Sequence, residues 1–85
     1  MNWQIEIARD ACKELARIPT QFQTRIASAI LALEQNPFPH GYKKLKNRDG
    51  FRIRVGDYRV LYFADTKLKK IVIGVIGHRR EVYRD

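Results

Sequence analysis

Hydrophobic and polar residues follow a clear period over most of this chain, and the period changes along it. Residues 3–7 alternate strictly, which predicts a first strand that turns Trp3, Ile5 and Ile7 toward the core. Over residues about 8–18 the apolar positions recur at helical spacing, so an amphipathic helix is expected there. Its apolar face, which we expect to lie in the core, consists of Ala8, Ala11, Cys12, Leu15 and Ile18.

A second helix is expected after Pro19, which ends the first one. Thr20 and Gln23 have the spacing of a capping box, in which each side chain bonds the other residue's backbone N–H. The apolar stripe of this helix consists of Phe22, Ile26, Ala29, Ile30 and Leu33. Pro37 and Pro39 close the segment, because proline does not continue a helix.

Residues 38–50 lack a clean period and are predicted to form a basic loop that ends in an Asp–Gly turn signal. The basic residues of this loop are Lys43, Lys44, Lys46 and Arg48. Three strands are expected after it, at about 51–55, 58–64 and 70–77. The last of them is apolar almost without interruption, which indicates an interior strand buried on both sides.

The predicted order of elements is therefore β-α-α-β-β-β. This order favours an α+β fold in which two helices pack on one face of a small, mostly antiparallel sheet. With 85 residues the chain is expected to form one domain, 1–85. Its longest apolar run, 71–77, is far shorter than the roughly 20 residues that a membrane span needs. With a single cysteine and no visible secretory signal, a soluble cytoplasmic protein is expected.

The hairpin predicted at residues 51–62 brings like charges together. A two-residue Gly–Asp turn sets Arg54 directly opposite Arg59. Alternation along the strand adds Arg52 to the same face. Like charges that face each other across strands are destabilising, so this arrangement favours a bound anion between them. The alternative is a basic sheet face that is simply exposed to solvent.

The net charge is distributed unevenly. The chain carries 17 Lys and Arg against 9 Asp and Glu, a net charge of +8. Basic and acidic residues balance over residues 1–42, so the whole excess lies in residues 43–85. A one-sided basic field on a small domain is typical of proteins that bind nucleic acid or another polyanion. Two histidines and one cysteine disfavour a zinc site made by protein ligands alone, and neither a metal nor a cofactor is expected.

Arginine can clamp a phosphodiester and stabilise charge that develops on it, but it cannot act as a general base. Proton transfer needs another group, and residues 77–84 offer three. His78 has an unperturbed pKa of about 6.5, which suits acid or base catalysis. Tyr83 could donate a proton or stack on a base. Glu81 could orient a guanidinium. The alternatives are a surface histidine at a strand end and a tyrosine that only packs the tail onto the sheet.

The motifs at residues 45–46, 51–62 and 76–83 resemble, in combination, the RelE/ParE superfamily of toxin–antitoxin toxins. The resemblance covers essentially the whole chain. It implies the β-α-α-β-β-β fold and an antitoxin that neutralises the protein. In this superfamily the RelE branch cleaves messenger RNA in the ribosomal A site, and the ParE branch poisons DNA gyrase.

The resemblance also implies site residues, because RelE-type enzymes place basic residues on the open sheet face and a tyrosine near the C-terminus. The catalytic residues expected on this basis, with the histidine added as general base, are Arg52, Arg54, Arg59, His78, Arg79 and Tyr83. The residues expected to contact RNA are Lys43, Lys44, Lys46, Arg48 and Arg80, the last of which is also a candidate contact for the antitoxin. Some RelE enzymes carry lysines at the positions of Arg52 and Arg54, so this chain must find its general base elsewhere.

The function expected from these features is a metal-independent endoribonuclease that acts on ribosome-bound messenger RNA through the ribose 2′-hydroxyl. Its expected partners are an acidic antitoxin, the ribosome and messenger RNA, with operator DNA contacted only through the antitoxin. Leu61 and Phe63 are expected to be exposed on the sheet face until the antitoxin covers them. The alternatives are a ParE-like poison of gyrase without chemistry, and a toxin that has lost its activity and only occupies its antitoxin.

Overall fold

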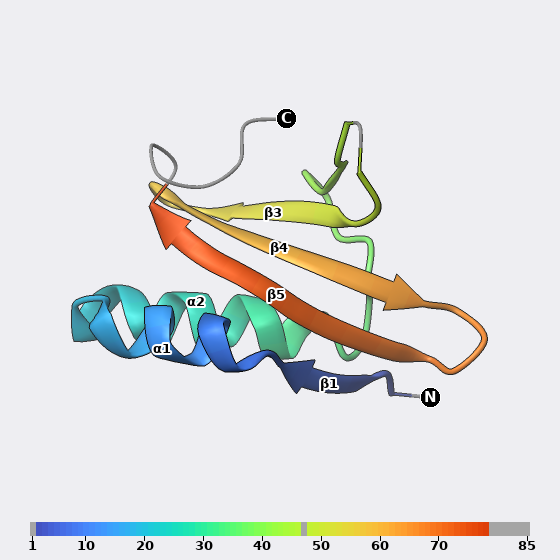
Figure 1. Cartoon of the computed structure of the whole chain (residues 1–85), viewed down its shortest axis with the longest axis horizontal. Helices are drawn as coiled ribbons and strands as arrows, with labels where there is room; N and C mark the ends of the chain where they lie inside the picture. The colour runs from blue at the N-terminus through green and yellow to red at the C-terminus, as the bar shows by residue number, and fades with distance from the viewer. Residues whose placement is uncertain (1, 47, 79–85) are drawn as a thin grey trace.

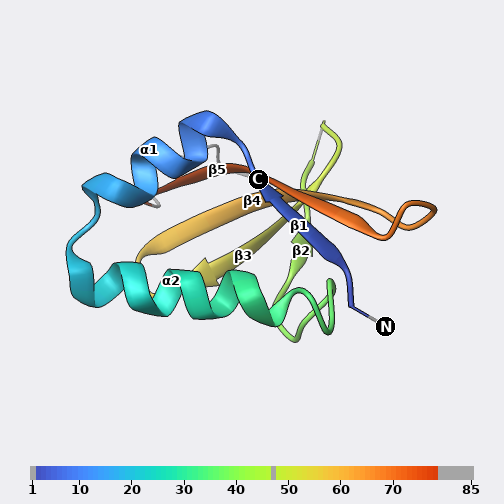
Figure 2. The same ribbon diagram turned by 90° about the horizontal axis from the view of Figure 1, so that it is seen from below.

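The computed structural model describes residues 2–46 and 48–78. Its elements are, in chain order, β1 (Gln4–Ile7), α1 (Arg9–Arg17), α2 (Thr20–Ala32), β2 (Lys43–Lys44), β3 (Phe51–Val55), β4 (Tyr58–Asp65) and β5 (Lys70–His78). The strands form one sheet in the order β1-β5-β4-β3-β2. Only the β1–β5 pair is parallel among these neighbours. Both helices lie on one side of the sheet (Figures 1 and 2), which confirms the predicted α+β fold.

The core lies between the helices and the face of the sheet that they cover. Ile53 of β3 and Val60 of β4 are cross-strand neighbours there, and both are buried. Burial of one such side chain contributes about 1.5–3 kcal/mol. The buried residues of this cluster are Ala11, Ile18, Ile26, Ile30, Leu33, Ile53, Val60, Tyr62, Ile71, Ile73 and Ile76. Because alternate residues of each strand enter this core, the remaining ones line the opposite, open face of the sheet.

The predicted hairpin register is confirmed. Arg54 pairs with Arg59 across the β3–β4 ladder, as the Gly–Asp turn requires. Gly56 has a φ of +60°, which suits the first central position of a type II′ turn. The interior position of β5, between β1 and β4, is also as predicted. The β4–β5 ladder contains a bulge, where the pairing shifts between Leu61 and Tyr62. The extra residue on β5 is Gly74.

The prediction of a simple loop at residues 38–50 is wrong in one respect, because Lys43 and Lys44 form the short strand β2 against β3. Two residues are too few to show an alternating pattern in the sequence. The chain then folds back on itself, and the Leu45 N–H donates to the Gly50 carbonyl at 3.0 Å.

Two predictions about the helices are also wrong. The capping box is absent, because Thr20 is the first residue of α2 and Pro19 is the N-cap residue. No side chain makes a capping hydrogen bond at this helix end. Gln23 instead donates to the Ile18 carbonyl at 2.8 Å and so fastens the connection between the helices. Cys12 is exposed rather than buried in the core. Because α1 is short and buries only Ala11 fully, the edge of its apolar stripe stays in solvent.

None of the helices within the described ranges is long and apolar enough to cross a membrane.

Candidate functional site

The open face of the sheet carries the predicted arginines in two adjacent rows. Arg54, Arg59 and Gly77 are cross-strand neighbours in the first row. Gly77 has no side chain, so β5 contributes none beside Arg59 in this row. In the second row Arg52 pairs with Leu61. The structure therefore brings all three arginines of the hairpin to one face.

These arginines differ in exposure, although they share one face of the sheet. Arg54 is exposed and Arg59 is half-buried, but Arg52 is only 4% exposed. Arg52 lies next to apolar Leu61, and the long stem of an arginine readily covers such a surface. Of the three hairpin arginines, Arg54 is therefore the exposed one and Arg59 is accessible in part. Arg52 is buried in the adjacent row, between Lys43 and Leu61.

Part of the open face is apolar. Leu45 reaches over from the loop after β2 and forms a small cluster with Leu61 and Val75. The expectation that Leu61 is exposed is therefore wrong, since only 3% of it is accessible. The expectation for Phe63 is confirmed, with 48% of this residue exposed.

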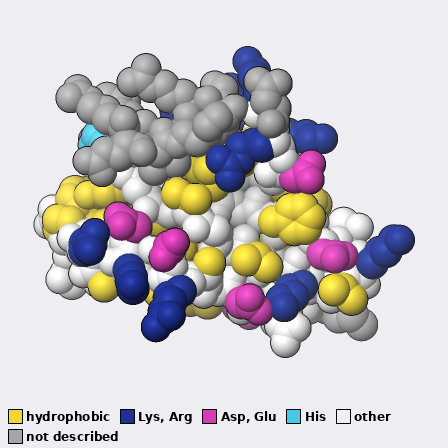
Figure 3. Space-filling view, in the orientation of Figure 1, with side chains coloured by type: hydrophobic (Ala, Val, Ile, Leu, Met, Phe, Trp, Pro, Cys, Tyr) yellow, Lys and Arg dark blue, Asp and Glu magenta, His cyan; other side chains and the backbone are white. Residues whose placement is uncertain are grey.

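The predicted RNA-binding lysines and arginine of the loop border this face. All four are exposed in the structure: Lys43, Lys44, Lys46 and Arg48. Figure 3 shows Lys and Arg side chains on this side of the molecule, close to exposed hydrophobic side chains and to Asp or Glu. The surface therefore combines cations with apolar area, a combination that suits a polyanion with flat rings.

His78 does not share the face of the arginines. It pairs with Tyr58, one residue beyond the row of Arg59, and therefore points to the helix side. Ring contacts agree with this, because His78 lies 5.7 Å from Tyr58 and Tyr58 lies 5.5 Å from Phe22 of α2. The surroundings of His78 also include Arg17 at the end of α1. This geometry therefore disfavours His78 as a general base beside Arg54 and Arg59.

Tyr62 is a buried polar group next to the site. Its hydroxyl donates to the Pro37 carbonyl at 2.7 Å and so ties the segment after α2 to the sheet. Burial, reinforced by the nearby Tyr42, raises the pKa of Tyr62 from 10.0 to about 12. The phenol is therefore protonated at neutral pH and serves as a structural donor.

Three predicted site residues, Arg79, Arg80 and Tyr83, lie outside the described residues. Within residues 2–46 and 48–78 there is no group of three or more His, Cys, Asp or Glu side chains that could hold a metal ion.

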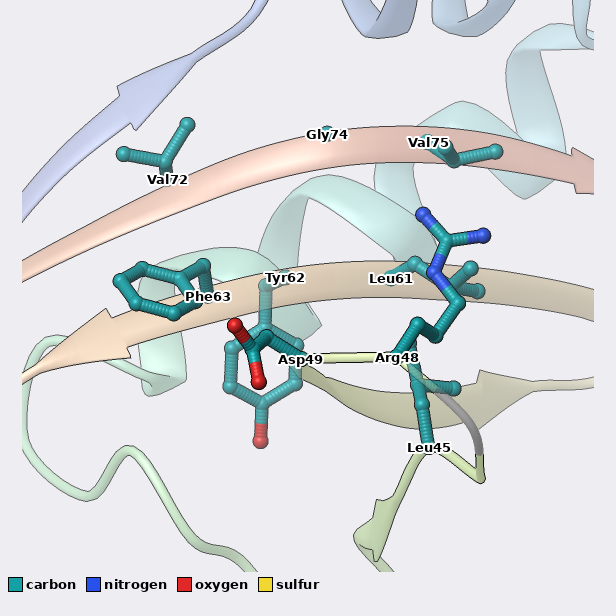
Figure 4. Close-up of a pocket in the computed structure, with 9 residues that line it drawn as sticks. All are labelled: Leu45, Arg48, Asp49, Leu61, Tyr62, Phe63, Val72, Gly74 and Val75. Carbon is teal, nitrogen blue, oxygen red and sulfur yellow. The ribbon is translucent and has the colours of Figure 1, made fainter. Parts of the chain in front are cut away.

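Sequence reasoning missed a small hollow on the open face, which Figure 4 shows in close-up. Its volume is about 130 Å³. It is lined by Leu45, Arg48, Asp49, Leu61, Tyr62, Phe63, Val72, Gly74 and Val75. The available signal was Gly74 within an otherwise apolar strand, since such a glycine often marks a bulge or a site of close approach.

Comparisons with known proteins agree with the resemblance seen in the sequence. Residues 5–83 match the family model described as ParE toxin of type II toxin–antitoxin system, parDE. Toxin RelE1 of Methanocaldococcus jannaschii is 29% identical over 89 residues, which cover 100% of this chain and 99% of that protein.

Two solved structures are similar over nearly the whole chain. The archaeal RelE–RelB complex from Pyrococcus horikoshii OT3 matches with 30% identity and a TM-score of 0.84, covering 96% of this chain and 100% of that one. The RelB–RelE antitoxin–toxin complex from Methanococcus jannaschii matches with 27% identity and a TM-score of 0.71, covering 91% and 93%.

Proposed function

Because the chain belongs to the ParE toxin family of type II toxin–antitoxin systems and is RelE-like, we propose that it is a ribosome-dependent endoribonuclease that cleaves messenger RNA. The observation that carries this proposal is the placement of Arg54 directly opposite Arg59 on the open face. Two guanidiniums in adjacent positions repel each other, and a phosphodiester between them removes that repulsion.

The proposed chemistry is attack of the ribose 2′-hydroxyl on the adjacent phosphorus. The bond between the 2′-oxygen and phosphorus forms, and the bond from phosphorus to the 5′-oxygen of the next nucleotide breaks. The products are a 2′,3′-cyclic phosphate and a 5′-hydroxyl. Arg54 and Arg59 stabilise the negative charge that grows on the phosphoryl oxygens, with Arg52 beneath them. A well-placed donor of this kind is worth about 10²–10³ in rate. In this proposal the arginines stabilise the charge on the phosphate, which a metal ion does in other nucleases.

The two proton transfers require groups beyond these arginines. A base must take the proton of the 2′-hydroxyl, and an acid must supply one to the departing 5′-oxygen. We assign one of these proton transfers to Tyr83. Arg79 is a further ligand of the phosphate. Because His78 points to the helix side, we assign it no proton transfer.

The proposed partners follow the charge of the surface. The exposed loop cations, together with Arg80, hold the RNA backbone on the ribosome. An acidic antitoxin neutralises the protein by covering the same surface, including exposed Phe63. Both matched structures described above are complexes of a toxin with its antitoxin, which supports this partner. Operator DNA is contacted only through the antitoxin, and the site of action is the cytoplasm, where ribosomes translate.

One observation favours a second function. The matching family model is described as a ParE toxin, and the ParE branch acts on DNA gyrase by binding it. In that case the arginines of the open face form a protein interface and no bond is broken.

Primer extension on messages translated in a reconstituted system distinguishes the two functions. We expect cuts at fixed codon positions that depend on ribosomes. Arg59→Lys keeps the charge but loses the two-pronged donor geometry, so the cleavage rate should fall by about 10²-fold. Arg9→Lys makes the same exchange at an exposed position on α1 and should leave the rate unchanged. Intact messages in this system, together with double-strand DNA breaks in cells that express the protein, would refute the nuclease and favour the gyrase poison.

A further inference from the structure

The bottom of the small hollow on the open face is apolar, and Gly74 leaves part of it without a side chain. At the β4–β5 bulge Gly74 leaves a gap between Val72 and Val75 on the strand. A Cβ atom built on Gly74 would meet nothing closer than the Leu61 carbonyl oxygen at 3.9 Å. The space next to Gly74 is therefore wide enough to accept at least one more carbon atom.

One aromatic ring borders the hollow. Phe63 pairs with Val72 across the strands and is 48% exposed, so one side of its ring is available to a ligand. Base-on-aromatic stacking is a common source of affinity for unpaired nucleic acid. With about 130 Å³ the hollow is smaller than the roughly 300–1,000 Å³ of typical small-molecule pockets, so it suits one flat ring rather than a whole cofactor.

Two charged side chains lie at the rim. Figure 4 shows the Asp49 carboxylate next to Phe63 and the Arg48 guanidinium extending toward Val75 on β5. A carboxylate only accepts hydrogen bonds, whereas a guanidinium only donates them. A ligand that fits must therefore present a donor on its ring and a negative charge near the ring. A nucleotide with an amino group on its base has both.

The hollow lies on the same strand as the proposed cleavage site. Phe63 follows Arg59 by four residues on β4, which corresponds to about 13 Å along a strand. An RNA chain whose phosphate lies between Arg54 and Arg59 can reach it within a few nucleotides.

We propose that this hollow binds one base of the message, cytosine, and so makes cleavage depend on sequence near the cut. The small volume selects a single-ring base. Cytosine then offers its N4 amino group to the Asp49 carboxylate, a pairing that proteins use to read this base. Uracil carries a carbonyl oxygen at the same place, which the carboxylate repels. Arg48 binds the phosphate of the same nucleotide. The inference rests on the proposed nuclease function.

The test compares messages that differ only by cytosine or uracil, placed in turn at each position of the A-site codon and its neighbours on programmed ribosomes. We expect one position at which cytosine raises kcat/KM about tenfold over uracil, the effect of one good base contact. Gly74→Val fills the hollow without positive-φ strain and should abolish that preference while uracil messages are still cut. Asp49→Asn, which can also donate to the uracil carbonyl, should equalise the two bases.

Leu68→Ala is the matched control, because Leu68 is 71% exposed at the β4–β5 turn and lies outside the hollow. It should keep the full preference for cytosine. A wild-type protein that cuts without any such preference, or a Gly74→Val variant that retains it, would overturn the base-binding hollow and leave the nuclease intact. Failure of the wild type to cut any ribosome-bound message would overturn both. If Gly74→Val weakens antitoxin binding but not base preference, the hollow holds a protein side chain and the inference is wrong.

Discussion

The hydroxyl of Tyr62 holds the segment after α2 against the sheet, so its removal should lower the free energy of unfolding. Tyr62→Phe deletes a hydrogen bond of 2.7 Å to the Pro37 carbonyl. A hydrogen bond of this type contributes about 1 kcal/mol net, and a buried carbonyl left without its donor adds a desolvation penalty. Because Tyr62 is only 3% exposed, water does not replace the lost donor easily. We expect the variant to be less stable by about 1–2 kcal/mol at neutral pH.

The same hydroxyl makes the stability depend on pH. The pKa of Tyr62 is raised from 10.0 to about 12 in the folded state, so the folded protein keeps this proton longer than the unfolded chain does. The resulting stabilisation is fully present below about pH 10 and is lost as the pH rises toward 12. At 1.36 kcal/mol for each pKa unit, the wild type should lose about 1.3 kcal/mol through this group between pH 9 and pH 11.

Urea unfolding followed by circular dichroism measures both effects. The free energy of unfolding of the wild type should exceed that of Tyr62→Phe at pH 7 and at pH 9, and the two values should nearly meet by pH 11. Comparison of the two proteins cancels the titration of lysines, which both of them contain. A difference that stays constant from pH 7 to pH 11 would refute the raised pKa. A variant as stable as the wild type at pH 7 would refute the role of the hydrogen bond.

Two further predictions follow from the backbone and the site. Gly50→Ala should lower the free energy of unfolding by about 2 kcal/mol or more, because φ is +115° and the new Cβ would lie 3.0 Å from the Tyr62 carbonyl oxygen. Gly41→Ala, also at positive φ but with nothing within 4 Å, should cost clearly less in the same urea titration, and equal losses would contradict this. His78→Gln should leave the pH profile of cleavage between about pH 5.5 and 7.5 unchanged, since this ring faces the helices. A flattened profile would restore His78 as the general base.

Local signals were sufficient to predict the hairpin and the helices. The two-residue turn at Gly56 fixes the register of β3 and β4, and register fixes which side chains face each other. The pairing of Arg54 with Arg59 could therefore be predicted residue by residue. The helices could be predicted because their apolar positions recur with the helical period and Pro19 separates them.

The failures concern features that depend on contacts between distant segments. The burial of Leu61 depends on Leu45, which comes from the loop after β2. The face on which His78 lies depends on the β4–β5 register, and the bulge at Gly74 shifts that register by one residue. A shift of one residue moves a side chain to the other face of a sheet. The pattern of apolar and polar residues along a single strand therefore cannot predict the burial of Leu61 or the face of His78.

The parallel pairing of β1 with β5 has a consequence for synthesis. Among the described strands, β1 is synthesised first, but its neighbour in the sheet, β5, is synthesised last. Until Ile71 and Ile73 have emerged, Ile5 and Ile7 have no strand beside them and the helices have no complete sheet to cover. Larger proteins commonly fold from the N-terminus while synthesis continues. In this protein the N-terminal strand and the helices cannot complete their packing in that way, because β5 is still missing. The sheet that carries the arginine surface is therefore completed only after β5 has been synthesised and has paired with β1 and β4.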